Sequence, residues 1–225
     1  SEINKSAAVV GSKNMSGDIF FPSNITYNSK EYVIKSILKE AFDESRLIKV
    51  IRFAPDSQLL IIKKRAFNNS RIERITIPSH VTHIKKRAFS DCSKLQIVEI
   101  PKDSELQIID DDAFSNSAIE KIYLPIHLVK IGKKAFYQCS KLQTVEIAKN
   151  SEIIEIGELA FSNTKIESFE IPPHLTKILF GTFSRTSELK NIEFPADSEI
   201  DTISIGSFDQ SSIESFTIPP KVTEI

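Results

Sequence analysis

The sequence predicts a right-handed repeat solenoid of the α/β type that is rich in β-structure, with one short parallel strand and one short helical turn in each coil. Aliphatic residues and prolines recur at fixed offsets from a phenylalanine. A repeat period of about 20 to 50 residues is typical of solenoids, whose coils stack and share one continuous core. The phenylalanines alternate at intervals of 25 and 22 residues and are Phe42, Phe67, Phe89, Phe114, Phe136, Phe161, Phe183 and Phe208.

The repeat divides the chain into two predicted parts. Residues 37–225 hold about eight coils and should form the solenoid, whereas residues 1–36 lack the repeat and should form an N-terminal cap. Residues 1–17 are small and polar, and we expect them to fray. The β-prone runs 18–22 and 31–34 flank a polar stretch, which predicts a hairpin. A terminal cap would shield the open end of the first coil.

Each coil repeats the same internal pattern. In the four long coils, apolar residues follow the phenylalanine by six, nine and eleven positions, as at Leu142, Val145 and Ile147; in the four short coils the offsets are five, eight and ten. The last two alternate with one polar residue, as in a strand with one buried face. Proline, which cannot donate to a ladder, follows this strand in seven of the eight coils and would end it. A second aliphatic pair, such as Leu128 and Ile131, should line the opposite wall. The small residue before each phenylalanine predicts a tight helical turn.

The C-terminal end lacks a second cap in this sequence. The chain stops partway through a coil at Ile225. Because an uncovered apolar end is a liability, we expect either a fragment of a longer array or an end that another chain covers. If another chain covers this end, it could be a second copy of the same protein, so self-association through the uncapped end is also expected.

The composition indicates an ordered, soluble protein. It is 40% hydrophobic and 26% charged, with a formal net charge of −1. No apolar run approaches the roughly 20 residues that cross a bilayer, and there is no apolar stretch of a signal peptide at the start. The chain is therefore either cytosolic or a mature or excised piece. Basic residues outnumber acidic ones 16 to 8 in residues 1–90, and acidic outnumber basic 22 to 13 in residues 91–225, so the rod should be electrically polar along its axis.

The repeats carry a family resemblance. Each reads aliphatic-x-x-aliphatic-x-aliphatic-Pro, then an aliphatic, Ile, two or three polar residues, Ala-Phe and Cys or Ser, as in residues 132–156. Over roughly residues 37–225 this pattern resembles the BspA-type leucine-rich repeat, and the 25/22 alternation is similar to protozoan members. The resemblance implies a leucine-rich-repeat superhelix on a cell surface that adheres to host proteins or cells. It offers no catalytic motif, so no active residue is carried over.

The function that these observations predict is binding without catalysis. We expect a ligand-binding module of a cell-surface adhesin or surface antigen, exposed on a cell or secreted, that contacts an extracellular protein or an acidic glycan in cell adhesion and host–pathogen interaction. An intracellular scaffold with the same solenoid is one alternative, and a structural spacer whose repeat face binds nothing is another.

The polar residues between the two inward aliphatics form a column along the predicted sheet. Facing like charges destabilise a sheet. Its glutamates are therefore either a solvated face diluted by nearby lysines, or a site for a basic partner or a loosely held cation. The candidate ligand-binding residues are Glu99, Tyr123, Glu146, Glu170 and Glu193.

A second column precedes the phenylalanines and is basic in two successive coils. In the next coil it reads Asp110 to Asp112, and basic rows on both sides can neutralise these aspartates, so an inter-coil salt-bridge ladder explains them better than a calcium site. The two basic rows lack such compensation on their other side. They form either a solvated edge or a patch for an acidic glycan or another polyanion. The patch residues are Lys63, Lys64, Arg65, Lys85, Lys86 and Arg87.

Other reactive residue types predict no further chemistry. Cys92 and Cys139 lie in equivalent positions two coils apart, about 10 Å at ordinary strand spacing, which is too far for a disulfide, so we expect two buried thiols. His80, His127 and His174 share one column with the same spacing, which disfavours a zinc site. No Ser-His-Asp set, phosphate loop or HExxH motif is present. We therefore expect no enzyme, cofactor or metal. Nucleic acid is disfavoured because net charge is near zero and the aromatic residues sit in the core register.

Overall fold

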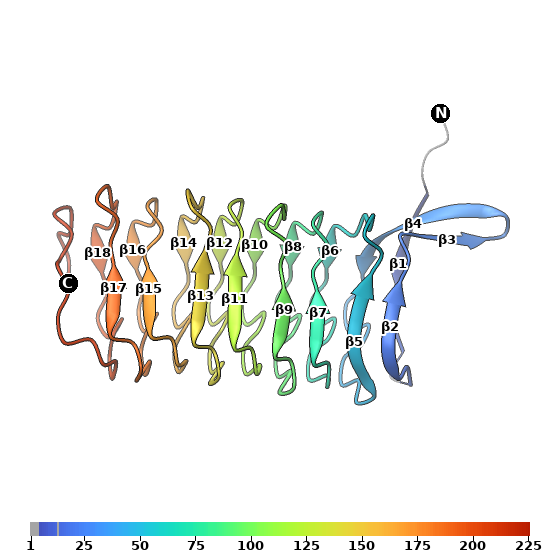
Figure 1. Cartoon of the computed structure of the whole chain (residues 1–225), viewed down its shortest axis with the longest axis horizontal. Coiled ribbons are helices and arrows are strands. Elements are labelled where there is room, and N and C mark those ends of the chain that lie inside the picture. Colours follow the sequence, from blue (N-terminus) through green and yellow to red (C-terminus); the bar gives the residue numbers. More distant parts are fainter. Residues whose placement is uncertain (1–4, 13) are drawn as a thin grey trace.

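The structure is a computed structural model that describes residues 5–12 and 14–225. Coils stack side by side along the long axis of a rod (Figure 1). Each regular coil contributes a strand to a front sheet and a second, two-residue strand to a back sheet. The front strands are β2 (Gly17–Phe21), β5 (Ile48–Phe53), β7 (Arg74–Thr76), β9 (Ile97–Glu99), β11 (Lys121–Leu124), β13 (Thr144–Ile147), β15 (Ser168–Glu170) and β17 (Asn191–Glu193). The back strands are β1 (Lys5–Val9), β4 (Lys30–Ile37), β6 (Ile61–Ile62), β8 (His83–Ile84), β10 (Ile108–Ile109), β12 (Lys130–Ile131), β14 (Glu155–Ile156), β16 (Lys177–Ile178) and β18 (Thr202–Ile203); β3 (Asn24–Tyr27) pairs with β4.

The repeat solenoid of parallel strands is confirmed, but two details of the prediction are wrong. A coil has two parallel strands rather than one, because the aliphatic pair on the opposite wall also forms ladder hydrogen bonds, as between Ile109 and Ile131. The predicted helical turns are absent from residues 5–12 and 14–225. Each phenylalanine instead lies between two residues in the left-handed region, two positions before and two after it, with φ from 52° to 69°. Such residues cannot continue a right-handed helix.

The phenylalanine segment forms a third ladder between coils. The amide of each repeat phenylalanine donates to the carbonyl of the residue before the next one, from Phe42 to Ala66 through Phe183 to Ser207, at 2.6–2.9 Å. Residues between these donors close local turns, as Ala66 N–H does on the carbonyl of Lys63 at 3.1 Å. Hydrogen bonds to the next coil thus alternate with hydrogen bonds inside local turns. Together they satisfy the buried backbone N–H groups of this segment without a helix.

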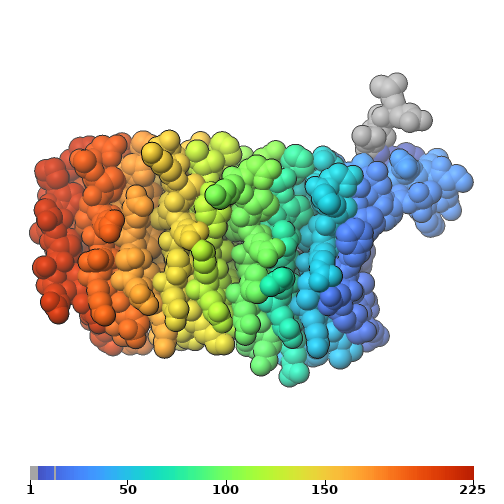
Figure 2. Space-filling view, in the orientation of Figure 1, coloured from blue at the N-terminus to red at the C-terminus, as the bar shows by residue number. Residues whose placement is uncertain are grey.

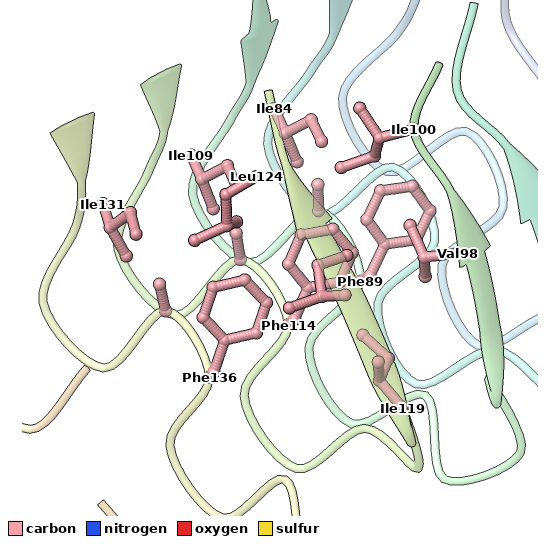
Figure 3. Close-up of a cluster of buried hydrophobic side chains, with 14 of the residues drawn as sticks. Ile84, Phe89, Val98, Ile100, Ile109, Phe114, Ile119, Leu124, Ile131 and Phe136 are labelled. Atoms are coloured by element: carbon pink, nitrogen blue, oxygen red, sulfur yellow. The ribbon is translucent and has the colours of Figure 1, made fainter. Parts of the chain in front are cut away.

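The core consists of a column of phenylalanines and neighbouring columns of aliphatic side chains (Figure 3). From Phe42 to Phe183 the repeat phenylalanines have no solvent exposure. Successive rings from Phe42 to Phe208 lie 5.1–5.8 Å apart at interplanar angles of 2–10°. Columns of isoleucine, leucine and valine from both sheets surround this stack. Each ring is covered by the ring of the next coil, so a single coil could not bury its own apolar face.

The N-terminal hairpin differs from the predicted one. It joins β3 to β4 with Asn28 and Ser29 at its tip, both at positive φ, and it projects beyond the end of the rod (Figure 2). The run predicted as its first arm is instead β2, which pairs in parallel with β5 and extends the front sheet. Alternation of Ile19 and Phe21, which face the core, fits this sheet position. Residues 5–9, expected to fray, form β1 beside β4. The cap boundary at residue 36 stays a prediction.

The front ladder is interrupted between β13 and β15, and the back ladder between β14 and β16. In β15, Phe169 occupies the core position that aliphatic residues fill in the preceding coils. Its ring lies 5.2 Å from that of Phe161 and 4.8 Å from that of Phe183. We attribute the front interruption to this larger side chain, which holds the strand away from the line of β13. Phe216 replaces the aliphatic residue in the same way in the last coil, and no strand is assigned there within the described residues.

The cysteines are two free, fully buried thiols, as predicted. Cys92 donates to the carbonyl of Phe67 at 3.0 Å, and Cys139 to that of Phe114 at 3.1 Å. Burial raises the pKa of Cys92 to about 12 and that of Cys139 to about 11, although hydrogen bonds from Ser70 and Ser117 oppose the shift. Both groups therefore stay protonated, and chemically inert, at neutral pH.

Replacing one ring of the stack should destabilise the whole array. We expect Phe136→Ala to lower the free energy of unfolding by about 3–5 kcal/mol, because it leaves a cavity between two rings. Urea unfolding followed by circular dichroism measures this loss. Phe20→Ala, at an exposed phenylalanine on β2, is the matched control and should change stability by less than about 0.5 kcal/mol. Equal effects of the two substitutions would refute the stacked-core account.

The two thiols should react only after unfolding. At pH 8 we expect the native protein to react with a thiol reagent at least about a hundredfold more slowly than the urea-unfolded chain, because burial keeps the thiols protonated. The control Lys149→Cys introduces an exposed thiol and should react rapidly in the native state. Fast modification of Cys92 or Cys139 in the folded protein would contradict their assignment to the core.

Candidate functional site

The front sheet presents an outward column that runs along the rod. Its residues lie between the inward aliphatics because side chains alternate across a strand. In register, Phe20 pairs with Arg52, Thr76 with Glu99, Tyr123 with Glu146, and Glu170 with Glu193. The glutamates are exposed and Tyr123 is half-buried. All five candidate residues of the sheet face therefore lie on one surface.

The members of this column differ in how their charge is compensated. Glu99 accepts a hydrogen bond from Thr76 Oγ1 at 2.6 Å, and Glu146 forms an ion pair with Lys121 at 2.5 Å. At the N-terminal end Arg52 pairs with Asp18 at 3.3 Å. Three positions in the column thus carry internal partners.

Glu170 and Glu193 form the uncompensated part of the face. They are direct register partners on β15 and β17, and neither has an ion pair or side-chain hydrogen bond recorded within residues 5–12 and 14–225. Glu146 lies one coil before this pair, but the ladder is interrupted between β13 and β15, and Glu146 has its own partner, Lys121. The acidic pair is therefore local to the C-terminal coils.

A small pocket lies beside Glu170. It has a volume of about 200 Å³, below the roughly 300–1,000 Å³ of typical small-molecule sites. Ile147 from β13 and the prolines that end the strands form its apolar wall, and Glu170 supplies a carboxylate. Lys149 and Asp197 also line it and contribute one charge of each sign. A pocket of this kind can hold one protruding basic side chain, with its aliphatic stem on the wall and its charge at Glu170. The sequence pattern gave no sign of it, because the wall comes from three different coils.

The histidine column lies on the loop edge and pairs with glutamates of the following coils. His80 contacts Glu105 at 2.9 Å, and the equivalent contacts of His127 and His174 measure 3.2 and 3.4 Å. Among the described residues, no group of three His, Cys, Asp or Glu side chains could hold a metal ion. These histidines therefore belong to inter-coil pairs in this structure.

The lysines of the basic patch line a groove beside the back sheet. The groove has a volume of about 390 Å³. It contains a cation that the sequence analysis missed, Lys39, which precedes the first repeat phenylalanine and shares a column with Lys64 and Lys86. The adjoining column holds Lys63 and Lys85, and Ile61 of β6 contributes an apolar surface between them. Aligning the first coil with the later ones on their phenylalanines would have placed Lys39 in the same column as Lys64 and Lys86.

The two arginines of the predicted patch are engaged elsewhere. Arg65 pairs with Asp43 of the preceding coil at 3.0 Å and Arg87 with Asp112 at 3.5 Å. The expectation that the first basic row has no compensation on its other side is therefore wrong for Arg65, because Asp43 lies one coil before it. The patch that faces solvent is formed by the lysines together with the half-exposed side chain of Arg87.

The aspartate row closes the groove on its C-terminal side. Lys85 lies 4.0 Å from Asp110, and Lys86 lies 3.5 Å from Asp111, so the predicted inter-coil salt bridges are confirmed on the side of the preceding coil. On the other side, Lys133 pairs with Glu158 at 2.5 Å. Next to the groove, burial lowers the pKa of His83, Lys85 lowers it further, and Asp110 opposes both. His83 therefore adds little positive charge at neutral pH.

A family comparison agrees with the repeat geometry. The model of the BspA type leucine-rich repeat region matches residues 13–143 and 107–225. A search of curated proteins found no match. No helix in the described part of the chain is both long and apolar enough to span a membrane.

Solved structures of bacterial proteins share the fold. A leucine-rich repeat protein from Bacteroides ovatus is 25% identical, with a TM-score of 0.78 over 92% of this chain and 55% of its own. The pneumococcal vaccine antigen PcpA is 22% identical, with a TM-score of 0.65 over 93% of this chain and 62% of its own. The leucine-rich repeat protein of T. pallidum is 23% identical, with a TM-score of 0.60 over 75% of this chain and 76% of its own.

This chain thus spans little more than half the length of the Bacteroides ovatus protein and less than two thirds of PcpA. The family model matches nearly the whole sequence. The chain belongs to the BspA-type leucine-rich repeat family.

Proposed function

We propose that this chain is a non-catalytic ligand-binding module of a cell-surface or secreted adhesin or surface antigen, and that its front sheet binds a protein with a basic surface. Stacked repeats form extended binding surfaces in solenoid proteins generally. One protein of the same fold is a pneumococcal vaccine antigen, which supports placing this chain at a surface in contact with host molecules.

The observation that carries the proposal is the acidic pair on β15 and β17. Like charges that face each other on neighbouring strands destabilise a sheet, yet Glu170 and Glu193 are in direct register and exposed. A lysine or arginine from a partner would neutralise both carboxylates, and its stem would fit the pocket wall that includes Ile147. Such a contact would contribute more binding free energy than an isolated surface ion pair, because it would also relieve the repulsion between the two carboxylates.

Tyr123 extends the proposed contact surface toward the middle of the rod. It is the register partner of Glu146 and is half-buried, so its ring is already fixed by its neighbours. Tyrosine is enriched in protein interfaces because it offers a large rigid surface with one polar group. Glu99 and Glu146, which already have internal partners, would contribute rim contacts.

Two alternative functions can be distinguished from this proposal by different observations. An intracellular scaffold would use the same face, but a secretory signal or membrane anchor in the gene would contradict it. A structural spacer would bind nothing through its repeat face. Contact with an acidic glycan involves a different surface, the lysine groove.

Self-association through the last coil stays a prediction. Ile218 and Ile225 are exposed there, and Phe208 and Phe216 are only partly covered. A second copy that stacked on this face would continue the phenylalanine column. Dimerisation that Ile218→Asp abolished would support this mode of association.

The binding proposal can be tested with a panel of purified extracellular-matrix proteins and surface plasmon resonance. We expect at least one to bind, and Glu170→Gln/Glu193→Gln to weaken its binding about tenfold or more, because both carboxylates lose their charge. The matched control is Glu152→Gln/Glu199→Gln, which removes two charges from the loop edge and should change affinity less than about twofold.

Two results would contradict this proposal. Equal weakening by the two double variants would mean that net charge, and not the front face, controls binding. Absence of binding to every matrix protein would favour the spacer.

The acidic pair should also limit stability. We expect Glu170→Gln to raise the melting midpoint by about 1–3 °C, because it removes a repulsion across β15 and β17. Glu146→Gln should leave the midpoint unchanged or lower it, since it breaks the ion pair with Lys121. Differential scanning calorimetry at low salt measures both. A lower melting midpoint for Glu170→Gln would show that Glu170 and Glu193 do not repel each other enough to destabilise the sheet.

A further inference from the structure

We propose that the lysine groove is a second binding site, separate from the front sheet, and that its ligand is a linear sulfated polysaccharide. The groove is formed by Lys39, Lys63, Lys64, Lys85 and Lys86 around Ile61. It lies beside the back sheet and shares no residue with the acidic column of the front sheet. The inference therefore does not depend on the proposed function.

The spacing of the charges follows from the solenoid. β4, β6 and β8 are consecutive neighbours in the back sheet, so the three coils follow one another at about 4.8 Å. Lys39, Lys64 and Lys86 form one column across these coils, and Lys63 and Lys85 form the column beside it. Five cations thus extend over about 10 Å along the rod axis. This arrangement matches a short stretch of a chain with regularly repeated negative groups.

The cations at the N-terminal side of the groove are available to a ligand. Within the described residues, neither Lys63 nor Lys64 has a recorded ion pair, and Lys39 has only a 3.6 Å contact with its exposed neighbour Glu40. Lys85 and Lys86 have aspartate partners at 4.0 and 3.5 Å. The positive field is therefore strongest over the first two coils and ends at the aspartate row.

The lining and the short extent of the groove favour a sulfated saccharide over other polyanions. Its cations are lysines, which bind sulfate as point charges without the bidentate geometry that arginine offers, and Arg65 is held by Asp43 at 3.0 Å. No aromatic side chain lines it, although proteins that bind single-stranded nucleic acid stack bases on aromatic rings. Asp110 to Asp112 separate these lysines from the next cations of the column, Lys133 and Lys134, so the continuous positive surface is too short for a long duplex or a broad anionic membrane.

The test uses a heparin-derived octasaccharide and the whole chain in isothermal titration calorimetry at two salt concentrations. We expect binding that weakens as salt increases, because the contacts are exposed and ionic. Lys63→Gln/Lys64→Gln should weaken it about tenfold. Asp110→Asn/Asp111→Asn should strengthen it several-fold, because it frees Lys85 and Lys86. This second variant separates a direct effect from loss of folding, since misfolding could not increase affinity.

The matched control is Lys102→Gln/Lys149→Gln, which removes the same charge from two exposed lysines outside the groove. Its affinity should stay within about twofold of the unmodified chain. The proposal is overturned by absence of octasaccharide binding, by equal losses in the two lysine variants, or by unchanged affinity in the aspartate variant. It is also overturned if a single-stranded DNA of equal charge, or vesicles rich in phosphatidylserine, bind through Lys63 and Lys64 as tightly as the octasaccharide.

Discussion

The stacking of each coil on the next is the constraint on which the rest of this structure depends. A phenylalanine ring in one coil is covered by the equivalent ring of its neighbour at 5.1–5.8 Å, and the backbone around it donates to the neighbouring coil at 2.6–2.9 Å. Neither interaction can form within a single coil. Burial of apolar surface and satisfaction of the backbone are therefore coupled to the same repeat distance.

This constraint turns positions in the repeat into columns on the surface. Residues at equivalent positions of successive coils must lie side by side, so charges at such positions interact along the rod. The residue in the adjacent coil then decides whether a charge is neutralised. Lys86 lies beside Asp111 and forms an ion pair, whereas Glu170 lies in direct register with Glu193 and is not neutralised. Both proposed binding surfaces arise where a column repeats the same charge in adjacent coils.

The same logic explains why the candidate surfaces lie at opposite ends and on different faces. Basic residues predominate in residues 1–90 and acidic residues in residues 91–225. The lysine groove belongs to the first coils beside the back sheet, and the acidic pair to later coils of the front sheet. A rod with this polarity could engage an anionic and a basic ligand at the same time.

By itself, the sequence determined the solenoid, the front strands of the regular coils and the phenylalanine column, because a repeated pattern specifies which side chains must meet; β2, which lies outside the repeat, was predicted wrongly as a hairpin arm. Only the tertiary structure decided the second strand of each coil, the turns around the phenylalanine, and the interruption at Phe169. Left-handed residues such as Glu40 and Leu159 have no marked sequence preference for that conformation, so stacking imposes it. Which charges are neutralised was also decided in three dimensions, since Asp43 reaches Arg65, and Lys39 joins the groove, only after coils of unequal length are aligned.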